Sequence, residues 1–206
     1  MLDLSKTIDD FLKVEQIYRG GIKEIVTKLE ILNEQYEVLN DHNLIHSLES
    51  RVKAPESIIE KLGRYGFEIS LDSARENLTD IAGIRVVTCF INDIYDLEEL
   101  LLKQDDVTLI RRKDYVANPK ENGYRSLHLI VSVPVFLADR TEQVPVEIQI
   151  RTISMDFWAS LEHLLRYKKS KDIPEKINFE LKHCAEIGDS LDKRMQRIYD
   201  ELDKIK

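Results

Sequence analysis

The chain has few cysteines, no long apolar run and no excess of basic charge, and each absence excludes a class of protein. Its two cysteines, Cys89 and Cys184, are too few for a disulfide framework or for a structural zinc site made by cysteine alone. No apolar stretch reaches the roughly 18 residues of a membrane span. The acidic segment 1–13 lacks the apolar core of a signal peptide. We therefore expect a soluble, cytoplasmic protein.

Basic residues are outnumbered, because 30 Lys and Arg face 38 Asp and Glu, which gives a formal net charge of −8 over 206 residues. This balance argues against a basic coat for duplex nucleic acid. Apolar residues make up 43% of the chain, enough for a core and too many for a disordered protein. A small phosphate site needs only a local cluster of cations, so the distribution of the positive charge is decisive.

Helical periodicity marks both ends of the chain. Apolar residues recur at spacings of three and four over 18–39 and again over 177–202. Gly20-Gly21 interrupts the first stretch and predicts a break or kink. Pro174 suits the start of the C-terminal helix. These patterns predict long helices at both ends.

Between these ends the pattern predicts a mixed sheet with helices packed on it. Nearly continuous or alternating apolar residues predict strands over 81–90, 107–112, 127–135 and 143–151. Pro134 is expected to end or bend its strand. Helical patterns cover 91–103 and 153–168. Since neither repeats nor a low-complexity linker occur, we expect one domain with an α/β (α+β) fold.

Positive charge is concentrated in two short segments. Residues 1–50 hold five basic and ten acidic residues, whereas 51–64 hold four basic and two acidic and 111–125 hold five basic and two acidic. In the first basic segment, a helix beginning at Pro55 would place a hydroxyl and two cations on one face, namely Ser57, Lys61 and Arg64. Such a face can hold a polyphosphate, although a solvated helix face has the same spacing.

The second basic segment combines cations with loop signals and aromatic residues. Asn118-Pro119 and Asn122-Gly123 predict a loop, and Tyr115 and Tyr124 are rings that can stack on a base. A cationic loop with aromatic residues suits nucleotide capture. An ordinary surface loop between strands remains the alternative.

Two carboxylates are candidate metal ligands. Asp80 precedes the first buried strand, and Glu147 shares one face of a later strand with Gln149 and Arg151. Two such carboxylates could share Mg²⁺ with substrate phosphates, and one could act as a general base. The alternative is structural: Asp80 would cap a turn and Glu147 would pair with an arginine.

Five motifs, in this order and spacing, resemble the RelA/SpoT-type (p)ppGpp synthetases, and specifically the single-domain small alarmone synthetases. They are RVKAPESIIEKL (51–62), DIAGIRVV (80–87), NGYRSLH (122–128), EIQIRT (147–152) and MDFWASLEH (155–163). The loop and the MDFW sequence resemble the RelP-like more than the RelQ-like subgroup. The resemblance implies one synthetase domain over 1–206, made of a helical region (1–45), a catalytic core (46–170) and a C-terminal helix (171–206).

The resemblance also implies a nucleotidyltransferase-like sheet and transfer of pyrophosphate from ATP to the 3′-hydroxyl of GDP or GTP, with Mg²⁺ as cofactor. Asp80 and Glu147 would bind the metal, and Glu147 would activate the hydroxyl. The residues implied for ATP are Arg51, Lys53, Ser57, Lys61, Arg64 and Arg85. Those implied for the acceptor nucleotide are Lys113, Lys120, Tyr124, Arg125, His128, Gln149 and Asp156.

Other classes of function stay open at this point. The loop over 111–125 could instead bind single-stranded RNA, or the chain could be a catalytically dead assembly protein. The resemblance implies a homotetramer, and the wide apolar stripes of the terminal helices favour assembly through them. Packing of both helices on the sheet would instead leave a monomer.

Overall fold

The computed structural model describes the backbone of residues 4–40, 42–168 and 174–205, and the side chains of 14–40, 42–165 and 174–205. The helices of this part are α1 (Leu4–Asn40), α2 (Pro55–Tyr65), α3 (Leu71–Asn77), α4 (Ile91–Leu102), α5 (Ile153–Lys168) and α6 (Glu175–Asp203). Its strands are β1 (Ile45–Val52), β2 (Ala82–Thr88), β3 (Thr108–Asp114), β4 (Leu127–Phe136) and β5 (Thr141–Thr152). The predicted α/β class, with long helices at both ends, is confirmed.

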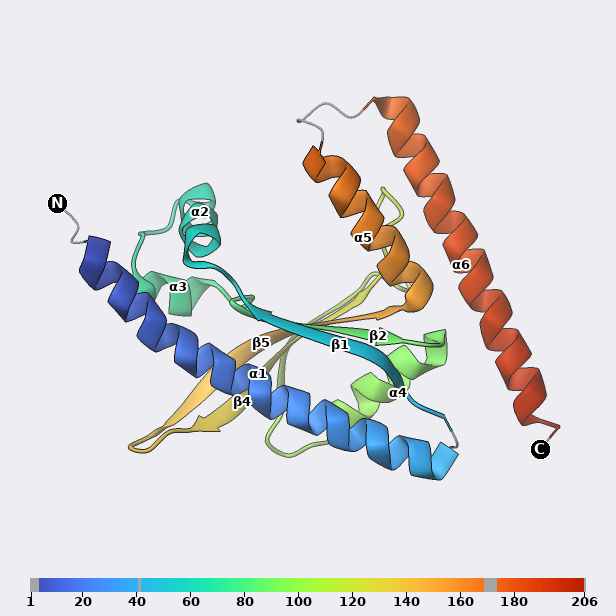
Figure 1. Cartoon of the computed structure of the whole chain (residues 1–206), viewed down its shortest axis with the longest axis horizontal. Helices are drawn as coiled ribbons and strands as arrows, with labels where there is room; N and C mark the ends of the chain where they lie inside the picture. The colour runs from blue at the N-terminus through green and yellow to red at the C-terminus, as the bar shows by residue number, and fades with distance from the viewer. Residues whose placement is uncertain (1–3, 41, 169–173, 206) are drawn as a thin grey trace.

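The strands form one five-stranded mixed sheet in the order β1-β2-β5-β4-β3. The central neighbours β2 and β5 are parallel, and the other neighbouring pairs are antiparallel. Figure 1 shows α1 along one side of the sheet, with α2 and the pair α5–α6 set apart on the opposite side. The space between α2 and α5 therefore lies over the middle strands.

The main core lies between the sheet and the helices α1 and α4. Alternate residues of β5, among them Val146, Ile148 and Ile150, have no exposed surface and pack in the same cluster as the apolar stripes of both helices. Burial of this kind contributes about 25 cal/mol per Å² of apolar surface. Because side chains alternate along a strand, the intervening residues of β5 face the side away from α1.

Helix α1 is continuous, so the predicted break at Gly20-Gly21 is wrong. The two glycines serve close packing instead. A Cβ atom on Gly20 would lie 2.7 Å from Cγ1 of Val135, and one on Gly21 would lie 2.7 Å from Cγ1 of Val144. Both distances are too short for real Cβ atoms, so glycine allows α1 to lie directly against β4 and β5.

Three further details differ from the pattern-based expectation. β1 and the short helix α3 were not predicted; β1 is an edge strand whose residues are all exposed or half-buried, so it lacks an apolar signal. Strand β4 continues through Pro134, which keeps its register opposite Gln143. The helix starts predicted at Pro55 and Pro174 are confirmed, since α2 begins at Pro55 and Pro174 directly precedes α6. Among the described helices, none combines the length and apolar character that a membrane span requires.

Candidate active site

A row of polar side chains crosses all five strands on the face away from α1. In neighbouring strands, Glu49 lies opposite Arg85, Arg85 opposite Gln149, Gln149 opposite His128, and His128 opposite Lys113. Laterally paired residues point to the same side of a sheet. The register therefore brings together cations and polar groups that are far apart in the sequence.

The neighbouring row contains the catalytic candidate Glu147. Glu147 lies opposite Gly83 of β2, and Gly83 lies opposite Arg51 of β1. Glycine contributes no side chain, so the surface above this position is open, and Arg51 and Glu147 line it together. The glycine in the middle of the row thus leaves room for a ligand beside the carboxylate.

Asp80 lies two residues before β2 and is held by two lysines. Its Oδ2 accepts hydrogen bonds from Nζ of Lys53 at 2.5 Å and from Nζ of Lys61 at 2.6 Å. Burial raises the pKa of the Asp80 carboxyl, but these hydrogen bonds outweigh burial and leave its pKa below the ordinary value. The other oxygen, Oδ1, is buried and has no hydrogen-bond partner among the described residues. An ionised carboxylate therefore presents one oxygen that is available to a ligand.

Glu147 is the second carboxylate of the site. Its Oε2 accepts a hydrogen bond from Nε2 of Gln149 at 3.2 Å, and its Oε1 lies 3.6 Å from Nδ1 of His128. Burial raises the pKa of Glu147, whereas His128 and Gln149 lower it, and the net pKa lies below the ordinary value. The negative charge of Asp80 acts in the opposite direction and raises the pKa of Glu147, so the two carboxylates interact electrostatically. Both are ionised at neutral pH.

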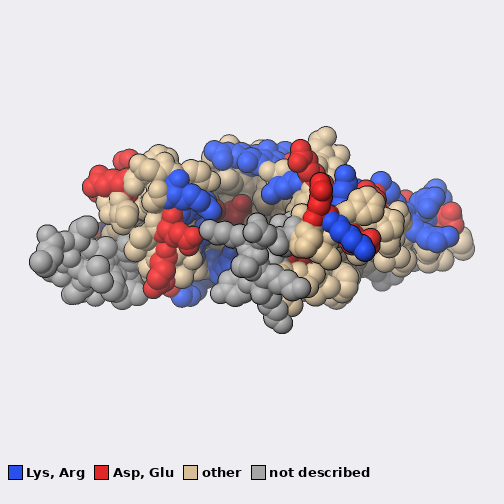
Figure 2. Space-filling view, turned by 90° about the horizontal axis from the view of Figure 1, so that it is seen from above, with Lys and Arg blue, Asp and Glu red and all other residues tan. Residues whose placement is uncertain are grey.

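Two hollows flank these carboxylates, and both are lined by Asp80 and Glu147. The first, of about 300 Å³, is also lined by Lys53, which directly follows β1, and by residues of β1, β2 and β5, among them Arg51, Arg85 and Gln149. The second, of about 280 Å³, is lined on its other sides mainly by Lys61, Tyr65, Arg111, Lys113, Tyr115, Lys120 and His128. Figure 2 shows Lys and Arg side chains gathered over the middle of this face, between the positions of α2 and α5. Two basic hollows thus share one pair of carboxylates.

The residues expected for ATP are divided between these hollows. Arg51, Lys53 and Arg85 line the first hollow, and Lys61 lines the second. Ser57 and Arg64 are exposed on α2 and line neither. The guanidinium carbon of Arg64 instead lies 5.4 Å from the ring centre of Tyr65. The structure therefore brings four of the six residues to the carboxylates.

Four of the seven residues expected for the acceptor nucleotide line one of the hollows, and Tyr124, Arg125 and Asp156 line neither. Lys113, Lys120 and His128 line the second hollow, whereas Gln149 lines the first. Asp156 accepts a 3.1 Å hydrogen bond from Nη1 of Arg151. Arg125 does not line either hollow; its Nη1 lies 2.5 Å from Oδ1 of Asp189 on α6.

An aromatic cluster borders the second hollow. The hydroxyl of Tyr124 lies 2.7 Å from Nε2 of His128. The rings of Tyr115 and Tyr124 meet edge to face, with centres 6.0 Å apart, and Nζ of Lys120 lies within 4.7 Å of both ring centres. This cation–π arrangement keeps a positive charge beside two rings on which a base can stack.

Arg151 connects the groups of the site, although it was not among the predicted site residues. Its Nη2 donates hydrogen bonds to Tyr124 Oη at 2.7 Å and to Gln149 Oε1 at 2.9 Å, and its Nη1 donates to Asp156. Arg151 is buried. Its place on the same strand face as Glu147 and Gln149 was the available signal, because a buried arginine needs such partners.

The donor set fits a divalent oxygen-seeking cation. The described residues contain no group of three or more His, Cys, Asp and Glu side chains that could hold a metal. Asp80 and Glu147 alone are two ionised carboxylates, and Asp80 has an unpaired buried oxygen. Mg²⁺ is commonly bound by one or two carboxylates, with water and substrate phosphates as its other ligands. The site therefore fits Mg²⁺ better than an ion that needs a cage made entirely of protein ligands.

Comparison with known proteins agrees with the motif resemblance. The family model described as "Region found in RelA / SpoT proteins" matches residues 50–172. The GTP pyrophosphokinase YwaC of Bacillus subtilis (strain 168) is 44% identical over 203 residues, which cover 98% of this chain and 97% of that protein. The GTP pyrophosphokinase YjbM of the same strain is 40% identical over 185 residues, 90% of this chain and 86% of that protein.

Solved structures give the same result. Small alarmone synthetase 2 from Bacillus subtilis superposes with a TM-score of 0.85 at 44% identity, over 93% of this chain and 99% of that one. Small alarmone synthetase 1 from the same organism, bound to its product pppGpp, superposes with a TM-score of 0.84 at 38% identity, over 93% and 97%. The chain therefore belongs to the RelA/SpoT family, in its small alarmone synthetase branch.

Proposed function

We propose that this protein is a GTP pyrophosphokinase, which transfers the β,γ-pyrophosphate of ATP to the 3′-hydroxyl of GDP or GTP. The observation that carries the proposal is the pair of basic hollows that share Asp80 and Glu147. One hollow would hold the donor and the other the acceptor, with the reacting atoms at the carboxylates. Phosphoryl transfer depends mainly on such positioning and on charge neutralisation.

The first hollow is the proposed ATP site. Arg51 and Arg85 would sandwich the adenine, since a guanidinium plane stacks on aromatic rings. Lys53 lines the first hollow and Lys61 the second, but both donate hydrogen bonds to Asp80, which lines both hollows. We place the ATP phosphates beside these two lysines, where the hollows meet. Ser57 and Arg64 would join them from α2, on which Ser57, Lys61 and Arg64 all follow Pro55.

The second hollow is the proposed acceptor site. Lys113 and Lys120 would bind the 5′-phosphates, and Tyr124 would stack on the guanine, with His128 and Gln149 beside it. Asp156 would accept hydrogen bonds from the guanine edge, which offers N1–H and N2–H₂ donors that adenine lacks. The resemblance implies that Arg125 contacts the acceptor phosphates. Its ion pair with Asp189 instead supports an indirect role, in which Arg125 does not touch the nucleotide.

Asp80 and Glu147 would hold Mg²⁺, which when bound neutralises charge on the phosphates. In the proposed step, the 3′-oxygen forms a bond to the β-phosphorus of ATP, and the bond from that phosphorus to the α,β-bridging oxygen breaks. AMP leaves, and the 3′-hydroxyl proton passes to Glu147. Because the pKa of Glu147 is low, it takes this proton as the new bond forms and not before.

We further propose that the chain assembles into a homotetramer in the cytoplasm, where ATP and GTP are available. The interface would be formed by α5 and α6, because the apolar stripe of the N-terminal helix α1 is already packed in the core. Exposed apolar residues recur along one side of α6 at spacings of four, four, three and four, namely Ile187, Leu191, Met195, Ile198 and Leu202. α5 adds the exposed residues Ile153, Phe157, Leu161, Leu164 and Leu165. A continuous apolar surface of this kind marks an interface. A second copy of the chain is the occupant we propose, because most soluble oligomers are symmetric assemblies of identical chains.

The direct test is a product assay. Purified protein is incubated with ATP and Mg²⁺ and with GDP, GTP or GMP in turn, and nucleotides are separated by thin-layer chromatography. We expect AMP and the 3′-pyrophosphorylated guanosine in equal amounts, a tetraphosphate from GDP and a pentaphosphate from GTP. If ATP is consumed without a 3′-phosphorylated guanosine product, the proposed reaction is wrong. A salt titration of single-stranded RNA binding is the parallel test of the alternative function.

A further inference from the structure

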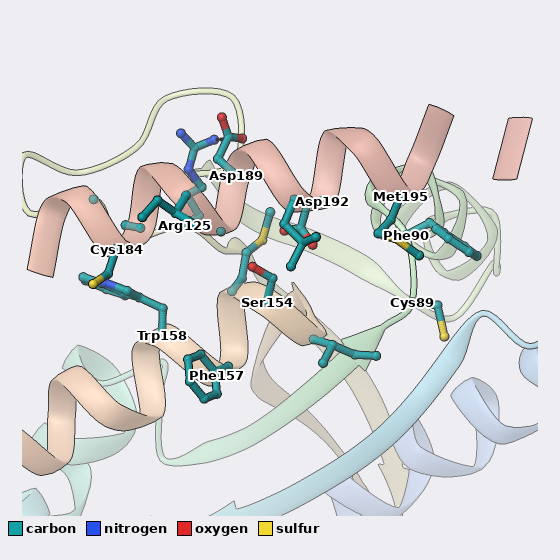
Figure 3. Close-up of a pocket in the computed structure, with 17 residues that line it drawn as sticks. Cys89, Phe90, Arg125, Ser154, Phe157, Trp158, Cys184, Asp189, Asp192 and Met195 are labelled. Atoms are coloured by element: carbon teal, nitrogen blue, oxygen red, sulfur yellow. Dashed lines mark hydrogen bonds and ion pairs between the residues drawn. The ribbon is translucent and has the colours of Figure 1, made fainter. Parts of the chain in front are cut away.

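Helix α6 makes a direct contact with the loop that carries the proposed acceptor residues. Nη1 of Arg125, in the loop before β4, lies 2.5 Å from Oδ1 of Asp189 in the middle of α6. Both side chains are less than one-fifth exposed. Figure 3 shows the guanidinium of Arg125 beside the carboxylate of Asp189. Neither residue lines either of the two basic hollows. A partly buried ion pair with this geometry holds its two segments in one relative position.

The backbone of the same loop lies against the helix. Gly123 has a φ of 90°, which side chains rarely adopt, and a Cβ atom there would lie 2.6 Å from Cβ of Ala185 and 3.5 Å from Cα of Lys182. Ala185 is buried. Only glycine on the loop and a small residue on the helix allow this approach. Sterics and charge therefore fix the loop at two adjacent points.

The helix itself is anchored to the rest of the fold. Thr152 at the end of β5 donates a 2.6 Å hydrogen bond to Asp192. Trp158 of α5 donates a 2.7 Å bond to the carbonyl of Leu181, and Gln196 accepts a 3.0 Å bond from the backbone of Asn92. α6 is thus attached to α5, β5 and α4, and a loop bound to it takes its position from these elements.

The residue between the two contact points is the proposed guanine-stacking residue. Tyr124 follows Gly123 and precedes Arg125, and its hydroxyl reaches His128 and Arg151. We propose that α6 positions the acceptor site, with Asp189 acting through Arg125 and Ala185 through Gly123 to hold Tyr124 in its binding geometry. Asp189 is then a positioning residue for the acceptor nucleotide, and this role rests on the acceptor site proposed above.

The test compares Michaelis constants for the two substrates. We expect Asp189→Asn to raise KM for GDP and GTP about five- to tenfold, since a displaced loop weakens the bound acceptor. KM for ATP and kcat at saturating acceptor should stay within about twofold. Asp189→Glu should restore most of the affinity. Lys193→Gln is the matched control, because Lys193 is an exposed partner of Asp189 one turn along the same helix.

Limited proteolysis reads the loop position without activity. Trypsin cleaves after Lys120 and Arg125, and a released loop is cut faster. We expect faster cleavage there in Asp189→Asn and in Gly123→Ala, with the thermal midpoint measured alongside to identify global unfolding.

Two results would overturn the proposal, and they differ in meaning. If Tyr124→Ala raises the acceptor KM while Asp189→Asn changes neither KM nor the cleavage rate, α6 does not position the loop and the acceptor site stands. If Tyr124→Ala leaves the acceptor KM unchanged, the proposed acceptor site is wrong and the role of Asp189 falls with it.

Discussion

Arg151 donates a 2.7 Å hydrogen bond to the hydroxyl of Tyr124, and this contact links the end of β5 to the loop before β4. The same guanidinium binds Gln149 and Asp156, so one buried arginine orients three groups on the acceptor side. Both Nη atoms of the planar guanidinium are used in these three contacts, whereas its buried Nε has no partner among the described residues. The acceptor side therefore depends on the shape of arginine as well as on its charge.

Arg151→Lys is the test of this geometry. An ammonium keeps the charge but cannot reach Tyr124, Gln149 and Asp156 at once, so we expect kcat/KM for GDP to fall about tenfold or more. KM for ATP should change little. Steady-state kinetics with each substrate varied in turn provide the measurement. A lysine variant with wild-type values for GDP would mean that charge alone is sufficient at this position.

Glu147→Gln should abolish product formation while the fold survives. The amide is close in size to the carboxylate but can neither accept the hydroxyl proton nor neutralise a metal ion. Chromatography measures product, and circular dichroism measures fold. Glu142→Gln is the matched control, because Glu142 lies on the same strand but lines neither hollow, and it should keep turnover. Near-normal turnover in Glu147→Gln would refute its role as base and ligand.

Asp156→Ala should weaken GDP and GTP use more than ATP use. Asp156 lies 3.1 Å from Arg151 on the acceptor side but 3.6 Å from Arg85 on the donor side, beyond hydrogen-bond length. We expect KM for the guanine nucleotides to rise about tenfold and KM for ATP to rise less than threefold, since one lost edge contact costs on the order of 1–3 kcal/mol. Equal losses for both substrates would contradict the assignment.

Local patterns predicted the individual strands and helices of this fold well, because each has its own period. The alternation in β5 placed Glu147 and Gln149 on a polar face before any contact was known. The lateral neighbours of these residues were beyond reach, because Arg85 pairs with Gln149 only through the parallel register of strands about 60 residues apart. β1 escaped prediction for the same reason: its place comes from pairing with β2 and not from apolar alternation.

The candidate site shows a similar division. Its basic segments follow from charge counts, but the partner of each cation is set by the fold. Arg125 belongs to the basic loop by sequence, but its guanidinium forms an ion pair with Asp189, which lies 64 residues later. Gly20-Gly21 likewise resembles a helix break and proves to be a packing contact, because Val135 and Val144 lie beneath it. A propensity describes a residue alone, whereas tertiary packing decides how it is used.

Asp192 gives the anchor of α6 a pH dependence. Burial raises the pKa of Asp192 to about 6, from an ordinary value of 3.8. A carboxyl whose pKa is raised in the folded state stabilises the fold while it is protonated. This stabilisation is fully present below the unfolded-state pKa of about 4 and is lost as the pH rises through about 6. We expect Asp192→Asn, which stays neutral, to be more stable than the parent at pH 7.5 by on the order of 2 kcal/mol.

Urea unfolding at pH 4.0 and 7.5 measures this effect. The gain from Asp192→Asn should shrink toward zero at pH 4.0, where the parent carboxyl is largely protonated in the folded state. Glu201→Gln removes an exposed charge from the same helix and should give parallel curves. If Asp192→Asn changes the free energy of unfolding by the same amount at both pH values, the pKa of Asp192 is not raised in the folded state.

Leu191→Arg should break the proposed assembly without breaking the fold. Leu191 is 53% exposed in the single chain and lines the apolar groove of about 720 Å³ between α5 and α6. A charge at the centre of an apolar interface costs several kcal/mol unless it is paired. Light scattering should give the mass of four 24.1 kDa chains for the parent and a smaller species for the variant.

Phe136→Arg, at an exposed position of β4 outside this groove, should keep the parent mass. A parent that scatters as a single chain would refute assembly through these helices, and an unchanged mass in Leu191→Arg would move the interface elsewhere.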